Sequence, residues 1–269
     1  MIRVFPRRTK WTPTDDLSFI GDPPLFRPSV QPVCISCTFT WDINESERLK
    51  RSWERFYPDV YVGGPAYDDL GGEFVPGRFV KEGVTITSRG CNKKCSYCFV
   101  PGREGKIREY PIKAGWILQD NNILACSKEH QKKVFEMLQG QKQINFNGGL
   151  DPLLLKPWHI KEFDRLSVRH FWFACDHPGT IPHIKKVADL MTDYKQWQKR
   201  CYVLIGFDDE TISKAEKRLN KVYELGFLPF AQLFQGKKKR PWTKEWDALQ
   251  RKWCRPAAYR IKSLTNQIG

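Results

Sequence analysis

The chain has 269 residues, of which 41% are hydrophobic and 13% aromatic, and its formal net charge is +15 at pH 7. A chain of this length and composition can bury a full hydrophobic core, which excludes an intrinsically disordered protein. The positive charge favours a polyanionic partner, with nucleic acid as the first candidate and an acidic membrane surface as the second.

Two features of the sequence bear on where the protein works. Residues 1–8 lack the continuous apolar stretch of a signal peptide, and no apolar run approaches the length needed to span a bilayer. The nine cysteines are scattered and odd in number, which is typical of reduced thiols rather than a disulfide framework. We therefore expect a cytoplasmic protein with no membrane partner.

Residues 1–82 are expected to form an N-terminal extension with a strand–helix–strand order. Residues 32–40 and 59–65 are extended runs, and Asn44 is a candidate cap for the helix between them. The apolar positions expected on this helix are Leu49, Trp53 and Phe56.

Cys34 and Cys37 form a C-x2-C pair inside the first of these runs. Such a pair can begin a metal site. Positions three apart on a strand face opposite sides, however, so we interpret both as buried core cysteines.

A second group of cysteines follows an extended run at residues 84–88. Cys91, Cys95 and Cys98 have the spacing C-x3-C-x2-C, and Tyr97 precedes the third cysteine. Structural zinc sites and closed ferredoxin-type clusters use four protein ligands. Three thiolates on one loop therefore indicate a metal site with one open position, where a substrate or cofactor can bind.

This loop resembles the signature of the radical S-adenosylmethionine (radical SAM) enzymes, in which an aromatic residue also precedes the third cysteine. The flanking residues Thr87–Gly90 and Phe99–Pro101 are similar to the family as well. The resemblance implies that the three cysteines ligate a 4Fe–4S cluster and that SAM chelates the fourth iron. Reductive cleavage of SAM would then produce a 5′-deoxyadenosyl radical that abstracts hydrogen from a substrate. It also implies an electron donor such as flavodoxin or ferredoxin.

The N-terminal extension resembles half of the cobalamin-binding domain that precedes the core in one large radical SAM subgroup. That domain carries a D-x-H-x-x-G motif, whose histidine takes a cobalt position. The chain lacks this motif, and its first histidine, His130, follows the cysteine loop. Cobalamin is therefore not expected.

From residue 83 onward the sequence alternates strands with helices, which predicts an α/β fold with parallel strands. The six expected strands span residues 84–88, 116–120, 143–147, 170–176, 200–207 and 228–234. The expected helices span residues 127–138, 157–167, 181–194 and 211–225, and residues 99–114 are expected to form a long loop. Six strands match the partial six-stranded (β/α) barrel of the radical SAM family, so the core is placed at residues 83–236.

Ligands of α/β barrels bind at the carboxyl ends of the strands. The resemblance implies that polar groups after the second strand hold the SAM ammonium, and the residues there are Asp120, Asn121 and Asn122. Gly148 and Gly149, after the third strand, would take that role if the strand count were shifted by one, with Asp151 displaced from the acid position. Turn formation alone is the alternative interpretation for all of these positions.

The fourth and fifth strands contribute three further candidates. Asp176 matches a polar residue that meets the SAM ribose or carboxylate in the family, and a helix cap is its alternative role. Ile205 and Gly206 resemble the family's late motif, in which an apolar residue and a glycine lie against adenine. The sequence assigns no catalytic residue that acts on the substrate.

Residues 237–269 form a basic, aromatic-rich C-terminal segment. Lys237–Arg240 is a continuous basic run directly after the sixth strand, and tryptophans are interleaved with the charges that follow. Basic and aromatic residues together favour nucleic-acid binding. Residues 245–254 also read as an amphipathic helix, in which Trp246, Leu249 and Trp253 would cover the core. Both interpretations stand.

The leading hypothesis is a radical SAM enzyme that modifies a nucleic acid or nucleotide. A peptide or a small metabolite is the alternative substrate. The alternative from another class is a non-catalytic nucleic-acid-binding protein with a zinc site formed by Cys34, Cys37, Cys95 and Cys98.

Overall fold

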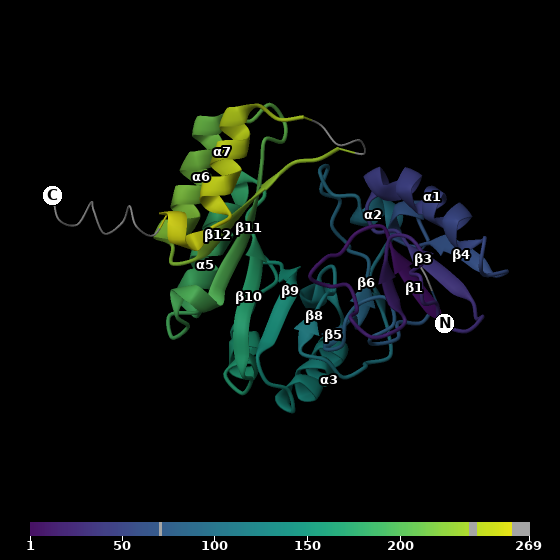
Figure 1. Ribbon diagram of the computed structural model, residues 1–269. Coiled ribbons are helices and arrows are strands. Elements are labelled where there is room, and N and C mark those ends of the chain that lie inside the picture. Colours follow the sequence, from purple (N-terminus) through teal and green to yellow (C-terminus); the bar gives the residue numbers. More distant parts are fainter. Residues whose placement is uncertain (70–71, 237–240, 260–269) are drawn as a thin grey trace. The chain divides into compact units, whose positions relative to one another are not determined.

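The computed structural model describes residues 1–69, 72–236 and 241–259. These residues divide into two compact units, and Figure 1 shows their secondary structure along the chain. The first unit comprises residues 1–84 with Gly236, and the second comprises residues 85–235 with 241–259. Each unit has its own sheet, so each is described by itself.

The N-terminal unit is a four-stranded parallel sheet with one long helix. The strands β1 (Ile2–Phe5), β2 (Ser18–Ile20), β3 (Val33–Ser36) and β4 (Val60–Gly63) have the order β2-β1-β3-β4. The helix α1 (Ile43–Trp53) packs Leu49 and Trp53 against strand residues such as Ile35. Burial of these apolar side chains supplies the core of the unit.

The expected strand–helix–strand order is present as β3, α1 and β4, but two details of the expectation are wrong. Asp42, not Asn44, is the N-cap of α1. Its side chain makes no capping hydrogen bond, because both carboxylate oxygens accept hydrogen bonds from Arg7 instead. Phe56 lies beyond the end of the helix and is 45% exposed, so it is not a core position.

The second unit contains a six-stranded sheet whose strands follow one another in chain order. The order is β12-β11-β10-β9-β8-β5, and the pairings from β8 to β12 are parallel. The strands are β5 (Val84–Thr85), β8 (Ile117–Leu118), β9 (Ile144–Leu150), β10 (Val168–Ala174), β11 (Lys199–Ile205) and β12 (Leu228–Leu233). The parallel α/β class is confirmed. The sheet is open, with β5 and β12 at its edges, so the barrel stays a prediction.

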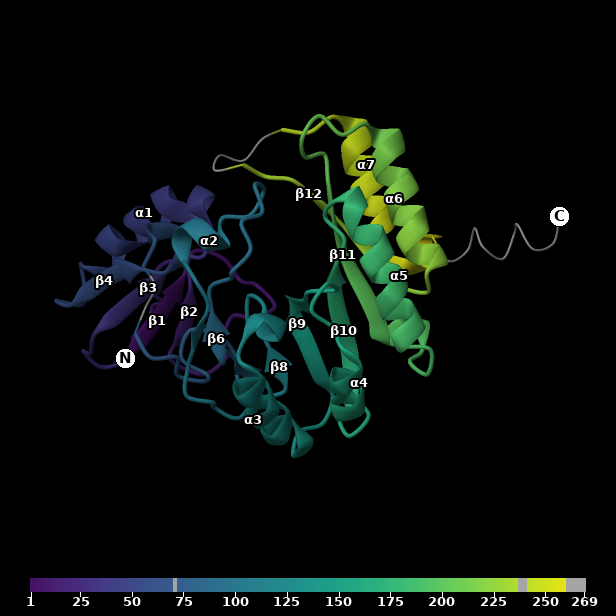
Figure 2. The same cartoon turned by 180° about the vertical axis from the view of Figure 1, so that it is seen from behind.

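The longer helices of the second unit connect successive strands, except for the last of them, which follows the final strand. They are α3 (Lys128–Gln139), α4 (Pro157–Phe163), α5 (Ile181–Leu190), α6 (Ile212–Glu224) and α7 (Lys244–Trp253). Ser127 and Thr211 cap α3 and α6 by accepting hydrogen bonds from backbone N–H groups. Gly226 follows α6 with φ of +80°, a conformation that glycine adopts readily. In both views, α5, α6 and α7 lie along the same side of β10–β12 (Figures 1 and 2).

The segment 99–114 is not a continuous loop. It contains a short helix, α2 (Val100–Arg103), and a strand, β7 (Arg108–Glu109). β7 pairs antiparallel with β6 (Ser88–Arg89). The expected first strand at 84–88 is accordingly split into β5 and β6.

The helix α7 confirms the amphipathic interpretation of residues 245–254. Leu249 and Trp253 are buried, and Trp246 packs against the same core. The basic run Lys237–Arg240 lies outside the described residues, as does most of the segment after α7. Within the ranges that the structure describes, no helix is both long enough and apolar enough to cross a membrane.

Candidate cofactor site at the strand ends

The three clustered cysteines lie on the loop between β6 and α2. Cys91, Cys95 and Cys98 are free thiols and are partly exposed. The turn is closed by the Cys98 backbone N–H, which donates to the Cys95 carbonyl at 3.0 Å. At the start of the loop, the Cys91 N–H donates to the Gly105 carbonyl at 3.1 Å. The loop is therefore held at both ends by backbone hydrogen bonds.

This loop contacts the carboxyl ends of several strands of the sheet. Asn122, after β8, donates from Nδ2 to the Cys91 sulfur at 3.7 Å. Lys93 pairs with Asp151, after β9, with 2.6 Å between Nζ and Oδ2. The Tyr97 ring meets Phe207, after β11, with the ring centroids 5.5 Å apart. Residues far apart in sequence thus converge on one loop, which is the arrangement expected of an α/β ligand site.

Lys93 and Phe207 are contacts that the sequence did not single out. Lys93 lies between two of the cysteines and is 38% exposed in its side chain, whereas the side chain of Asp151 is 7% exposed. A lysine in a charged loop is ordinarily solvated, and the position of its acid partner depends on where β9 ends. The one available signal was Asp151 itself, an acid directly after a glycine pair at a strand end.

Asp120 is placed at the expected strand end, but its carboxylate is engaged within the protein. Oδ1 accepts from the backbone N–H groups of Thr87 at 2.6 Å and Ser88 at 2.8 Å, and Oδ2 accepts from the Thr87 hydroxyl at 2.7 Å. Burial raises the pKa of Asp120, and these hydrogen bonds oppose that effect. The side chain replaces the sheet partners of residues 87–88, so it explains the break between β5 and β6 and anchors the start of the cysteine loop.

The next two residues also turn toward the loop. The Asn121 Oδ1 accepts from the Gly90 N–H at 2.9 Å. Asn122 is 6% exposed and donates to Asp151 at 3.4 Å as well as to Cys91. Its Oδ1 is buried and has no hydrogen-bond partner within the described structure. Buried polar atoms are normally satisfied, so this oxygen marks a position where a donor of a bound group would fit.

The two glycines of β9 have different roles. A Cβ on Gly148 would lie 1.8 Å from the Asp120 carbonyl oxygen, so a side chain at that position would collide with the backbone. Gly149 has φ of +100°, and a Cβ there would meet nothing within 4 Å. Gly148 thus permits a close backbone approach inside the protein, whereas Gly149 has open space beside its backbone. The strand order places Asp120–Asn122 after the second strand, as counted from the sequence.

The remaining candidates lie after β10 and at the end of β11. The Asp176 Oδ1 accepts from the Leu204 N–H at 3.0 Å, and burial raises the pKa of its carboxyl. Ile205 is fully buried in the hydrophobic core. A Cβ on Gly206 would lie 2.5 Å from the Trp242 ring, so that ring covers this face of Gly206. The described structure brings Asp176 close to the cysteine loop, while Ile205 and Gly206 pack against protein groups.

Electrostatics link the thiols to one another and to Tyr97. Burial raises the pKa of Cys98, and the neighbouring Cys95 and Cys91 thiols raise it further. Burial also raises the pKa of Tyr97, with Asp176 and Cys95 adding to the effect. Thiolates that repel one another in this way would be stabilised by a bound metal, which deprotonates coordinating thiols.

The donor set fits an iron–sulfur cluster by its chemistry and by its place in the fold. Among the residues that the structure describes, however, no three His, Cys, Asp or Glu side chains form a group that could hold a metal ion. The roles of the three cysteines as ligands therefore stay a prediction.

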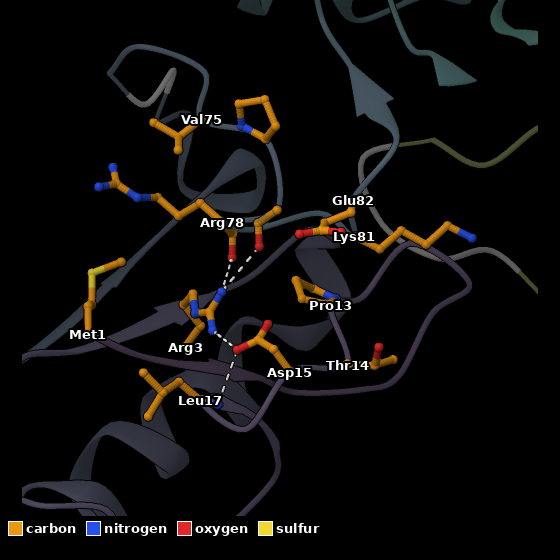
Figure 3. Close-up of a pocket in the computed structure, with 12 residues that line it drawn as sticks. Met1, Arg3, Pro13, Thr14, Asp15, Leu17, Val75, Arg78, Lys81 and Glu82 are labelled. Atoms are coloured by element: carbon orange, nitrogen blue, oxygen red, sulfur yellow. Dashed lines mark hydrogen bonds and ion pairs between the residues drawn. The ribbon is translucent and has the colours of Figure 1, made fainter. Parts of the chain in front are cut away.

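A separate pocket of about 790 Å³ lies in the N-terminal unit. Figure 3 shows Arg3 at its centre, donating to the carbonyls of Gly77 at 3.2 Å and Arg78 at 3.0 Å and paired with Asp15. These contacts engage the guanidinium in holding loop segments to β1. Arg3 therefore stabilises this unit and is not a candidate to bind a ligand.

Comparison with known proteins gives one informative match. No protein-family model matches the chain. A segment of 109 residues, which is 40% of the chain, is 31% identical to the tRNA-2-methylthio-N(6)-dimethylallyladenosine synthase of Thermodesulfovibrio yellowstonii. This segment spans 22% of that protein's own length. The match supports a relationship of the chain to the radical SAM enzymes.

Proposed function

We propose that the chain is a radical SAM enzyme in which Cys91, Cys95 and Cys98 hold a 4Fe–4S cluster. The observation that carries the proposal is the convergence of three strand ends on the cysteine loop. Asn122 contacts Cys91, Lys93 pairs with Asp151, and Tyr97 packs on Phe207. A loop fixed in this way can present three thiolates in a constant arrangement while leaving one cluster position open to SAM.

The protein residues have distinct tasks in this proposal. When bound, the cluster and SAM supply a one-electron reduction that generates a radical for hydrogen abstraction. Asp120 fixes the chain just before the loop, and the Asn122 amide donates to a ligand sulfur. Gly149 offers open backbone, and Asp176 lies beside Tyr97, so both are candidates to contact SAM.

We further propose that the substrate is a nucleic acid. The net charge of +15 supports this class, and the matched relative is named for a modified adenosine of tRNA. The nature of the modification is left open, as is the electron donor, for which a flavodoxin or a ferredoxin is the expected class.

Metal analysis after anaerobic reconstitution with iron and sulfide tests the cluster assignment. We expect iron and sulfide at the ratio of a 4Fe–4S cluster, and an electron paramagnetic resonance spectrum of the reduced protein that changes when SAM is added. The Cys95→Ala variant should lose the cluster, whereas Cys126→Ala, a buried thiol of the same unit, should retain it. Stoichiometric zinc, or equal iron in both variants, would reject the proposal.

A further inference from the structure

The six-stranded sheet has two faces of different character. The core face carries Phe146, Phe171 and Val203, and residues of the helices pack against these side chains. Because side chains alternate along strands, the intervening residues lie on the other face. The polar and aromatic residues among them are Asn145 and Asn147 of β9, His170 and Trp172 of β10, Arg200 and Tyr202 of β11, and Phe230 and Gln232 of β12, and they are accompanied by the apolar Ala174, Leu204 and Leu228. We call the eight polar and aromatic residues the aromatic face.

Three aromatic rings form the centre of the aromatic face. Trp172 and Tyr202 are stacked, with ring centroids 4.3 Å apart and planes at 19°. Phe230 stands edge-on to both, at 5.7 Å from Trp172 and 6.0 Å from Tyr202. Tyr202 and Phe230 are only partly buried. Trp172 is buried beneath its neighbours. Tyr202 and Phe230 therefore present the exposed aromatic surface, of the kind on which planar bases stack.

A series of polar contacts holds the positively charged guanidinium of Arg200 beside these rings. Arg200 lies over the Trp172 ring, 5.4 Å from its centroid, and its Nη2 approaches the His170 Nε2 at 3.3 Å. The His170 Nδ1 is in turn 2.9 Å from the Asn145 Oδ1. Burial lowers the pKa of His170 to about 4, and Arg200 and Arg169 contribute to the shift. His170 is thus neutral at pH 7, so it can donate to Asn145 and accept from the guanidinium, which orients Arg200 along the face.

The aromatic face adjoins the candidate cofactor site. The Tyr202 hydroxyl donates to the Asn147 carbonyl at 3.4 Å. Asn147 is followed by Gly148, which packs on the Asp120 backbone, and by the open backbone of Gly149. A molecule lying on the aromatic face therefore reaches the strand ends where the cysteine loop is held.

From these observations we infer that the aromatic face binds unpaired bases of a single-stranded nucleic acid and presents one of them to the cofactor site. Arg200 supplies positive charge, and the eight residues of the face include no acid, so the face complements a polyanion. Four strands at about 4.8 Å spacing make it roughly 14 Å wide, which exceeds the width of one base. This width favours a strand over a free nucleoside. Duplex bases, by contrast, are stacked on one another and cannot lie on the rings.

The inference rests on the proposed function, because it assigns a substrate to the proposed enzyme. RNA binding itself can be measured without any enzymatic activity. The full chain, reconstituted anaerobically and free of reductant and SAM, is titrated into a short fluorescein-labelled single-stranded RNA of mixed sequence, and anisotropy is recorded. Arg200→Gln and Phe230→Leu should each weaken binding by about tenfold, because each removes one base contact. Arg165→Gln, which removes an equal charge from an exposed position after α4, is the matched control and should change binding less than about twofold.

Competition separates base recognition from simple charge. Unlabelled single strands of RNA or DNA should displace the probe, whereas the duplex of the same sequence, adenosine monophosphate and polyglutamate should compete poorly. Equal binding by the Arg200 and Arg165 variants would overturn the inference, and so would equal competition by the duplex or by polyglutamate. Either outcome leaves the cluster and SAM cleavage to be judged by their own assays, so failure of the two proposals can be distinguished.

Discussion

Asn122 connects the end of β8 directly to a thiol of the cysteine loop. It is 6% exposed, and its amide N–H groups point at a thiol and at a carboxylate. Hydrogen bonds to ligand sulfur stabilise the reduced, more negative form of a cluster. In the proposed site, the residue that the family resemblance places against SAM would thus have a second task, which is to adjust the electronics of the cluster.

Replacing Asn122 by Ala tests this task. We expect the midpoint potential of the bound cluster to become more negative and iron retention to fall by about tenfold, the lower limit for loss of an outer-shell partner. A spectroelectrochemical titration measures the potential, and Asn145→Ala, outside the loop contacts, is the control. An unchanged potential would show that the Asn122 amide does not act on the sulfur.

Gly148 offers a test of the close backbone approach between β8 and β9. A Cβ at 1.8 Å from the Asp120 carbonyl oxygen forces the strands apart, so Gly148→Ala should lower the free energy of unfolding by about 3 kcal/mol. Gly140→Ala is the matched control. Its Cβ would lie 3.9 Å from the nearest atom and its φ is −78°, so it should change stability by less than about 1 kcal/mol. Chemical denaturation measures both, and equal stabilities would contradict the packing described.

At the scale of elements, the start of α4 illustrates how a buried histidine is accommodated. His159 is 2% exposed, its Nδ1 accepts from the Lys156 N–H at 2.8 Å, and its Nε2 lies 2.8 Å from the Gln131 Oε1. Both contacts are satisfied by the neutral ring. Burial lowers the pKa of His159 to about 4.

This pKa predicts how stability depends on pH. The unfolded chain takes up a proton near pH 6.5, whereas the folded chain does so only near pH 4, so the unfolded state binds more protons between these values. The free energy of unfolding should therefore fall as the pH is lowered from 6.5 to 4, by about 3 kcal/mol from this residue. His159→Gln should flatten the profile, and His183→Gln on α5 is the control. A slope unchanged by the His159 substitution would refute this assignment.

The elements that sequence reasoning predicted best are those with long, regular patterns. Apolar residues recur regularly in β10, β11 and β12, and this pattern predicted where these strands lie in the chain. Ser127 and Thr211 cap α3 and α6, and they predicted where these helices begin. Four-residue β1 and three-residue β2 were missed because such short runs carry no periodicity. Arg3 also interrupts β1 and is buried only because Asp15 and two carbonyls receive its charge.

The candidate site was only partly accessible to sequence reasoning for a related reason. The spacing of the three cysteines and the polar residues at the strand ends could be read from the chain. The structural role of Asp120 could not be predicted from the sequence. A carboxylate after a strand can accept hydrogen bonds from backbone N–H groups as readily as from a ligand. The cover of Trp242 over Gly206 depends on a segment that returns to the sheet from beyond β12.

At the scale of the whole molecule, the net charge of +15 predicts salt-dependent binding to nucleic acid. Replacing Lys237–Arg240 by serines removes four charges from a run that lies outside the described residues. For a single strand, the slope of log affinity against log salt should become shallower by about 3 if all four contact phosphates. Fluorescence anisotropy over a range of salt concentrations measures the slope. An unchanged slope and affinity would place these charges away from the nucleic acid.

The central claim is that the cysteine loop supports reductive cleavage of SAM. The most direct measurement is chromatographic detection of 5′-deoxyadenosine after the reconstituted, reduced chain is incubated with SAM under anaerobic conditions. We expect 5′-deoxyadenosine from the native chain and from Cys126→Ala, and none from Cys95→Ala. If the native chain carries a full complement of iron and sulfide and still forms no 5′-deoxyadenosine, or if Cys95→Ala forms as much as the native chain, the claim is contradicted.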